Sequence, residues 1–359
     1  MAKYSCKCCG AELYFDPKIG KLHCDYCDSV FDTSEYAGSA AEFGGQAKPA
    51  AYTDGEPVTE PSTDDSTGEL VIYQCPHCGA EVITAKSTAA TTCVYCNRAI
   101  TLEGNLTGDF APQYVLPFEK ERKDVEEAYT ALCHKSVLTP SLFRQESTIE
   151  KIKGMYIPFW LYSLEGDVQM LVHGENSTVH RHGNEEITEI SSFEVQESGH
   201  AIFPNIPADG LKDMDDALMD SIEPFDFEKL QKFNPAYLAG FYTQRWTSGA
   251  AENENRALTR AENAMTSRAF EEAGAFNHAK NIAGKEVTFS KKKVSYVMLP
   301  VWMMYTEYKG KKYLFGMNGQ TGKIIGKIPK DPGRIGKITA GVFIGSHLVM
   351  MLLRVLGVM

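Results

Sequence analysis

A gapless internal repeat of paired cysteines constrains this chain more than any other feature of its sequence. Each copy reads C-x2-C, fourteen residues, C-x2-C, and the second copy lies 69 residues after the first. This spacing is typical of a zinc ribbon with four thiolate ligands. The eight predicted metal ligands are Cys6, Cys9, Cys24, Cys27, Cys75, Cys78, Cys93 and Cys96. We therefore expect two structural Zn²⁺ ions.

The spacing follows from the geometry that zinc requires. Two cysteines three residues apart bind one ion from a single tight turn, so a tetrahedral site needs two such turns. Gly10 and Gly79 follow the first turn of each copy and supply a backbone position with positive φ. Asp28 and Asn97 follow the second turns, and both residue types tolerate the left-handed conformation. With four cysteine ligands each site is closed to water and substrate, which predicts a structural role.

Two of the ten cysteines lie outside this pattern. Cys8 crowds the first turn, but in the repeat it aligns with His77 and is not expected to bind metal. Cys133 stands alone far from either copy. Disulfide bonds are the alternative use for the paired cysteines. The CxxC pairing, the gapless repeat and the lack of an apolar leader favour metal binding on the cytosolic side.

Composition divides the chain into five predicted segments. Residues 33–70 carry one lysine against eight acidic residues and few large apolar side chains, which is typical of a solvated linker. The net charge is −11, and neither ribbon has an evident basic face, which disfavours nucleic-acid binding. The expected order is a first ribbon, an acidic linker, a second ribbon, an α+β domain and a membrane anchor, at residues 1–32, 33–70, 71–103, 104–333 and 334–359.

The C-terminal segment has the length and composition of a transmembrane helix. Residues 338–353 contain no Asp, Glu, Lys or Arg, and residues 338–359 would span about 33 Å as a helix, enough for a hydrocarbon core of roughly 30 Å. Arg354 lies close enough to the end to reach the far interface. The basic residues before the segment predict that this flank stays in the cytoplasm. An amphipathic or buried helix is the alternative.

The segment at 104–333 shows mixed helix and strand patterns. Apolar periodicity predicts helices over 119–135, 209–233 and 251–281. Strands are expected at 154–162, 167–172, 187–195, 293–308, 311–316 and 324–328, with turns at 308–311 and 318–322. The acidic run from Asp213 to Asp220 is expected to be the solvated face of a helix. We therefore predict the α+β class, with two small four-Cys ribbons and a C-terminal transmembrane helix.

Two strand segments resemble each other and suggest an internal duplication. Ile157-Pro-Phe-Trp160 and Leu299-Pro-Val-Trp302 both place proline two residues before tryptophan in an apolar run. Proline donates no ladder hydrogen bond, so we expect each at a sheet edge or a bulge. The pair could form the aromatic floor of a ligand groove, but two core strands of one sheet are the favoured interpretation.

The sequence carries no recognisable catalytic motif. The stretch Gly316–Lys323 superficially resembles a phosphate loop, but Met317 and Ile324 stand where the motif needs glycine and a hydroxyl residue. HExxH, GxSxG and dinucleotide fingerprints do not occur. We therefore do not expect an enzyme.

Several motifs along the chain resemble one family as a group. They are Cys75-Pro-His-Cys-Gly-Ala-Glu, Thr91-Thr-Cys-Val-Tyr-Cys, Gly154-x-Tyr-Ile-Pro-Phe-Trp-Leu, Ser221-Ile-Glu-Pro-Phe-Asp, Ala236-Tyr-Leu-Ala-Gly, Leu299-Pro-Val-Trp and Met317-Asn-Gly-Gln-Thr-Gly-Lys. The chain resembles the bacterial TFIIB-type zinc-ribbon-containing proteins. The resemblance implies a membrane association, and for some members a link to SPFH-domain and phage-shock PspA-like proteins in envelope stress. Other members carry a primosomal-helicase label, although this chain lacks a helicase motor.

These patterns lead to one expected function and one main alternative, beside an enzyme in residues 104–333, which has little support. The expected function is a non-enzymatic zinc-binding adaptor, tail-anchored in the cytoplasmic membrane, that recruits a cytosolic protein partner. The alternative is a nucleic-acid-binding protein that acts through its ribbons in replication or transcription. Clustered lysines, namely Lys3, Lys7, Lys18 and Lys21, are the residues that would serve it.

Overall fold

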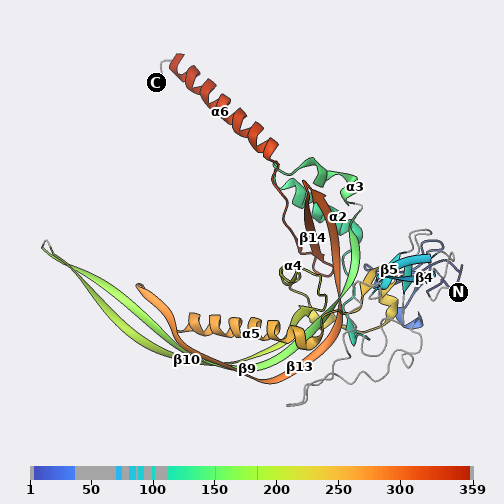
Figure 1. The fold of residues 1–359 in the computed structure, drawn as a ribbon, viewed down its shortest axis with the longest axis horizontal. Helices are drawn as coiled ribbons and strands as arrows, with labels where there is room; N and C mark the ends of the chain where they lie inside the picture. Colours follow the sequence, from blue (N-terminus) through green and yellow to red (C-terminus); the bar gives the residue numbers. More distant parts are fainter. Residues whose placement is uncertain are drawn as a thin grey trace.

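The protein is a mixed α+β chain with an extended sheet and a projecting C-terminal helix (Figure 1). This computed structural model describes residues 4–36, 70–74, 81–85, 88–92, 99–101, 111–149, 151–183 and 185–355. Most of the predicted acidic linker, together with Cys75, Cys78, Cys93, Cys96, Gly79 and Asn97, lies outside the described residues.

The described strands form three sheets. A small N-terminal sheet has the order β1-β2-β3, from Tyr14–Asp16, Lys21–His23 and Val30–Phe31. β4 (Leu70–Gln74) and β5 (Glu81–Ala85) form a hairpin. The ten strands of the large sheet are β6 (Thr88–Thr92), β7 (Ala99–Thr101), β8 (Tyr114–Val115), β9 (Lys153–His182), β10 (Glu185–Asp209), β11 (Gln231–Lys232), β12 (Tyr242–Gln244), β13 (Ala279–Tyr308), β14 (Lys311–Asn318) and β15 (Ile324–Gly326).

Five α-helices accompany these strands in the described residues. They are α2 (Arg122–His134), α3 (Glu146–Ile149), α4 (Asp216–Ser221), α5 (Ala250–Glu272) and α6 (Pro332–Val355). The predicted helices at 119–135 and 251–281 therefore form, although α5 ends at Glu272. Gly274 has φ of +95° and turns the chain into β13.

The predicted helix over 209–233 is wrong in its length. Only α4 forms, and a short 3₁₀ turn and β11 follow it. Pro224 lacks the N–H that a continuing helix needs and restricts the residue before it. Leu211, Leu218 and Ile222 are nevertheless buried in one cluster, so the apolar stripe identified core positions but not their secondary structure.

The acidic run from Asp213 to Asp220, which leads into α4, is also more than a solvated face. Asp215 caps α4 by accepting hydrogen bonds from the backbone N–H groups of Ala217 and Leu218. Asp216 and Asp220 pair with Arg256 of α5 at 2.8 and 2.5 Å. These pairs tie α4 to α5.

Three strands extend beyond the rest of the sheet as a curved arm (Figure 1). β9 and β10 form one antiparallel hairpin from Phe159↔Asp209 to His182↔Glu185, and β13 pairs along the other side of β9. The sequence predicted only short strands here, because glycines and polar residues interrupt the apolar pattern. Gly166 and Gly174 leave room for the rings of Phe289 and Phe276, where an added Cβ would lie 2.8 and 2.3 Å from ring carbons.

The similar Ile157–Trp160 and Leu299–Trp302 segments occupy equivalent positions in β9 and β13. They pair with each other, with Ile157 opposite Leu299. β12 runs parallel to β9 at Met155 and Tyr156, and β8 runs parallel to β13 at Val297 and Met298, so each short strand pairs with the long strand of the other half. The large sheet thus contains two strand–helix–hairpin units related by an approximate twofold axis, which extends the similarity of the two segments to their surroundings.

The two prolines lie neither at an edge nor at a bulge, contrary to expectation. Pro158 stands where the neighbour of β9 changes from β12 to β10, and Pro300 stands where the neighbour of β13 changes from β8 to β14. Each proline carbonyl still accepts a hydrogen bond, from the N–H of Gly210 at 2.8 Å and of Gly319 at 2.9 Å. Proline therefore costs the sheet least stability at a point where a strand changes its neighbour, because its missing N–H does not interrupt a continuous ladder there.

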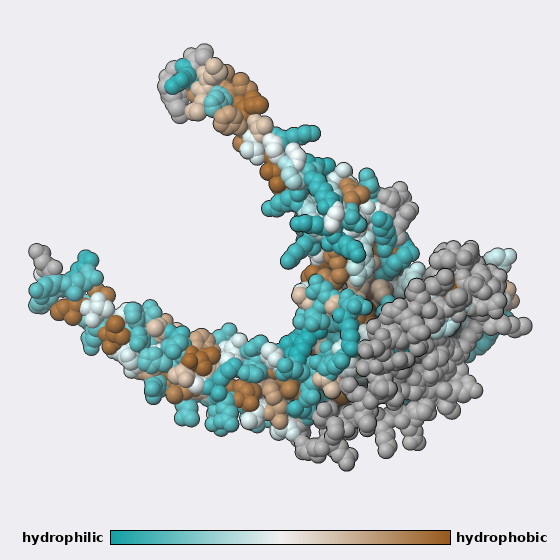
Figure 2. All heavy atoms as spheres, viewed as in Figure 1, coloured by the Kyte–Doolittle hydropathy of each residue, from teal (hydrophilic) through white to brown (hydrophobic). Residues whose placement is uncertain are grey.

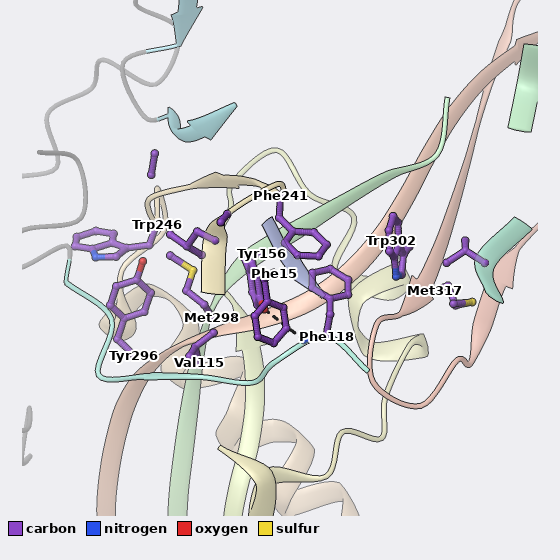
Figure 3. Close-up of a cluster of buried hydrophobic side chains, with 14 of the residues drawn as sticks. Phe15, Val115, Phe118, Tyr156, Phe241, Trp246, Tyr296, Met298, Trp302 and Met317 are labelled. Carbon is purple, nitrogen blue, oxygen red and sulfur yellow. Dashed lines mark hydrogen bonds between the residues drawn. The ribbon is translucent and has the colours of Figure 1, made fainter. Parts of the chain in front are cut away.

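The two tryptophans are core residues, as favoured, and they also fix the helices. Trp160 Nε1 donates to the carbonyl oxygen of Ser248 at 2.9 Å, and Trp302 Nε1 donates to that of Lys120 at 3.0 Å. Each acceptor lies two residues before the first residue of α5 or α2. The rings of Phe118 and Phe241 stack beside Trp302 with centroids 4.2 Å apart (Figure 3). This aromatic core joins both units.

The side chain of Asn318 holds the turn after β14 in place by hydrogen bonds. Its buried side chain donates to the carbonyl oxygens of Ile222 and Pro224, and it accepts from the N–H groups of Gln320 and Thr321. Asn318→Ala would leave four backbone groups without these partners. We expect it to lower the free energy of unfolding by about 3–5 kcal/mol in urea titrations followed by tryptophan fluorescence. The exposed Asn281→Ala is the control, and a loss below about 1 kcal/mol for Asn318→Ala would contradict the assignment.

Candidate metal centre

The first predicted zinc site assembles in the structure. The sulfur atoms of Cys6, Cys9, Cys24 and Cys27 all lie within 4.8 Å of one another. The distance is 3.5 Å between the sulfurs of Cys6 and Cys27, and also between those of Cys9 and Cys24. Ligands about 2.3 Å from a tetrahedral zinc ion lie roughly 3.8 Å apart, so the four sulfurs are placed to hold one metal ion.

Two matching backbone turns position the sulfurs. In the first turn the N–H of Gly10 donates to the carbonyl oxygen of Cys6 at 2.8 Å, and in the second the N–H of Asp28 donates to that of Cys24 at 2.9 Å. Gly10 has φ of +76° and Asp28 has φ of +55°. The predicted left-handed positions are therefore confirmed for this copy. The hairpin of β1 and β2 connects the turns.

The closeness of the four thiols opposes their ionisation together. Burial raises the pKa of Cys6, but the backbone N–H groups of Cys9 and Cys8 outweigh it and lower the pKa to about 6. The N–H of Ala11 lowers the pKa of Cys9, but burial and the neighbouring sulfurs outweigh this and raise it to about 12. Mutual repulsion opposes four thiolates this close, and a bound divalent cation would neutralise it.

The remaining described cysteines are excluded from the centre, as expected. Cys8 is exposed and does not belong to the cluster, although its N–H donates to the sulfur of Cys6 at 3.4 Å. Cys133 is buried in α2, and its thiol donates to the carbonyl oxygen of Phe143.

The segment that carries the four sulfurs is packed against the large sheet. The side chain of Phe15 enters the aromatic core (Figure 3), with its ring centroid 5.1 Å from that of Tyr237. The N–H of Phe15 donates to the carbonyl oxygen of Ala239, and the side-chain amide of Asn234 donates to that of Thr33. The segment of the second predicted ribbon also joins this sheet, because β6 pairs with β12 and Ala89, Ala90 and Ile100 are buried.

A cleft of about 490 Å³ lies between the first ribbon and the sheet. Tyr14 and Tyr26 border it on the ribbon side, and Arg122, Lys153 and Trp302 border it on the other. Tyr26 is 82% exposed, and the ammonium of Lys153 lies 5.8 Å from the ring centroid of Tyr242. Sequence reasoning missed this cleft because its walls come from five distant segments and share no local pattern.

Comparisons with known proteins identify one relative of this chain. The uncharacterized protein YdjG of Bacillus subtilis (strain 168) is 31% identical over 332 residues, which cover 79% of this chain and 97% of YdjG. No family model matches the chain. No solved structure matches it either.

The four-sulfur centre yields a prediction about metal content. We expect Cys24→Ser to lose the ion held by this centre, because the buried Cys24 supplies one of the four sulfurs. Cys8→Ser changes the neighbouring exposed thiol and should keep the wild-type metal content. Elemental analysis of the purified proteins measures both. Equal metal content in the two variants would refute the assignment of ligands.

Proposed function

The chain belongs to the same family as the uncharacterized protein YdjG of Bacillus subtilis, and we propose that it is a zinc-binding adaptor tail-anchored in the cytoplasmic membrane. In this proposal the chain is not an enzyme, and it holds a cytosolic protein partner at the membrane surface. The observation that carries the proposal is the exposed apolar helix α6. In this proposal the zinc ribbons and the cleft belong to the part of the chain that faces the cytosol.

The character of α6 supports the anchor. Pro332–Arg354 has 23 residues and contains an 18-residue window with a mean hydropathy of 1.6, and none of that window is buried in the protein. Large side chains such as Phe343, Leu348 and Met351 are 62–69% exposed. Burying one such side chain gains about 1.5–3 kcal/mol, so an unpartnered helix of this kind is costly in water. A length of about 35 Å is sufficient to cross a bilayer.

The charges beside α6 support a cytoplasmic location for the rest of the chain. Lys327, Lys330, Arg334 and Lys337 lie at its start, and Arg354 is the single charged residue near its end. Loops rich in lysine and arginine stay in the cytoplasm. Reduced cysteines suited to metal binding agree with this side of the membrane.

Two structural zinc ions complete the proposal. The first would be held by the four sulfurs of Cys6, Cys9, Cys24 and Cys27, which lie close together. The second is proposed from the repeat alone, on Cys75, Cys78, Cys93 and Cys96. Four-cysteine sites are closed, so both ions would fix the fold around the cleft and take no part in chemistry.

The cleft and Tyr26 supply the proposed contact with a protein partner. An exposed tyrosine on a rigid turn beside a cavity is typical of an interface anchor. The family resemblance suggests that the partner belongs to an envelope-stress system. The nucleic-acid alternative gains little support, because Lys7 pairs with Glu35, Lys18 with Glu121 and Lys21 with Asp32.

Truncation before the helix tests the anchor. We expect the full chain to stay in the membrane fraction after an alkaline wash, and a chain ending at Pro332 to be soluble, because it lacks the apolar segment. Cell fractionation with immunoblotting measures both. If the full chain were released by the wash, α6 would not span the membrane.

Substitution of Tyr26 tests the adaptor role. We expect Tyr26→Ala to reduce recovery of cross-linked cytosolic proteins at least about tenfold, as for an interface hot spot, while metal content stays unchanged. Val30→Ala changes another exposed ribbon residue that does not border the cleft, and it should bind normally. Quantitative mass spectrometry after membrane cross-linking compares the variants. Identical recovery for Tyr26→Ala and wild type would count against the cleft as the partner site.

A further inference from the structure

The residues that lead into the start of α6 are far more basic than the rest of the chain. Residues 307–337 contain eight lysines and arginines against two acidic residues, in a protein whose net charge is −11. Six of them form what we call the basic collar: Lys309, Lys311, Lys312, Lys330, Arg334 and Lys337. The five lysines are exposed, and Arg334 is half-buried.

The fold brings the collar residues to one end of the large sheet. Lys309 and Gly310 have φ of +52° and +72° and form the tight turn between β13 and β14. β15 runs back antiparallel to β14, with Gly326 opposite Phe315, so the chain after β15 returns toward this turn. The start of α6 therefore lies near the turn between β13 and β14 (Figure 1).

A third segment fixes this arrangement. The N–H of Asp331 donates to the carbonyl oxygen of Leu138 at 2.8 Å, and Arg334 donates to that of Val137 at 3.1 Å. A few residues on, the ring of Phe143 contacts those of Tyr308 and Tyr313, with centroids 5.8 and 5.6 Å apart. Hydrophilic side chains accordingly surround the base of α6 (Figure 2).

The collar lysines lack the acidic partners found elsewhere. On the arm, Lys285 pairs with Glu262 at 2.7 Å and Lys292 with Glu254 at 2.9 Å. Among described residues, no ion pair joins a collar lysine to an acid, and Arg334 alone faces one, Asp331 at 3.9 Å. Glu307, which stands opposite Lys312 in the β13–β14 pairing, and Asp331 are the two acidic residues of this stretch, so the six collar residues keep an excess of four positive charges.

We propose that the basic collar binds the anionic headgroups of phospholipids where α6 enters the bilayer. This inference rests on the proposed membrane anchor. An anionic bilayer is favoured over an acidic protein because the collar surrounds the point where the apolar helix begins. Val137, whose carbonyl oxygen accepts from Arg334, is 70% exposed. An exposed apolar side chain beside the start of α6 suits the interface between headgroups and lipid tails. Headgroup contacts at the turn as well as at the helix would hold the sheet in one orientation to the membrane.

Lysine labelling of the full chain in nanodiscs tests the collar. The nanodiscs contain phosphatidylcholine alone or phosphatidylcholine mixed with phosphatidylglycerol, and mass spectrometry gives the acetylation rate of each lysine. We expect Lys309, Lys311 and Lys312 to react about fivefold more slowly in the anionic nanodiscs, since one lysine near such a surface contributes about 1 kcal/mol. High salt should remove the difference. The exposed Lys232 and Lys293 are internal controls and should react equally in both.

A charge-reversal pair separates collar binding from general charge. Lys311→Glu with Lys312→Glu should abolish the slower labelling of Lys309, whereas Lys232→Glu with Lys293→Glu should leave it intact. Both pairs lie at exposed positions and change the net charge equally.

The outcomes distinguish this inference from the proposed anchor. If the chain enters both nanodiscs but the collar lysines react equally in the two, the collar does not bind lipid and the anchor stands. If the acetylation rate of the collar lysines falls only after an acidic protein or a nucleic acid is added, the collar binds that partner instead. If the chain enters neither nanodisc, the anchor fails and the inference fails with it.

Discussion

The antiparallel pairing of β9 with β13 is the interaction on which the rest of the structure depends. It runs from Lys153 opposite Met303 to Glu175 opposite Ala279. Along its other edge β9 pairs first with β12 and then with β10, and β13 pairs first with β8 and then with β14. Pro158 and Pro300 mark the points where the neighbouring strand changes. Beyond the core, the same two strands continue into the arm, where α5 covers Val168, Met170 and Val172 of β9. A slip of one residue in this pairing would turn the buried faces of both strands toward solvent.

Local patterns in the sequence predicted the parts of this molecule that local chemistry determines. The cysteine spacing predicted the four sulfurs that come together in the first ribbon and could hold one metal ion, and helical periodicity predicted α2 and α5. The turn at 308–311 followed from its glycine. Conversely, the arm was predicted only as fragments, because its strands are stabilised by pairing and by aromatic rings over Gly166 and Gly174. The helix over 209–233 failed for a related reason, because its apolar spacing reflected burial against the sheet and not an α-helical backbone.

The cleft and the collar could not be predicted from the sequence because each is assembled from distant segments. Arg122 is the first residue of α2, Lys153 and Trp302 lie at one end of the pairing between β9 and β13, and Tyr14 belongs to the ribbon. The collar combines a hairpin turn with the start of a helix about twenty residues later. Its individual lysines were visible in the sequence, but only the register of β14 and β15 places them together.

The position of both surfaces on β13 couples them mechanically. Trp302 borders the cleft, and the collar begins at Lys309, seven residues further along the same strand and turn. This separation is about 20 Å of continuous, paired backbone. The residues between them are also packed against Phe143 and the aromatic core, so no hinge separates the two surfaces. If the collar fixes the sheet on the headgroups, a partner in the cleft is held at a set distance from the bilayer, which a flexible tether alone would not achieve.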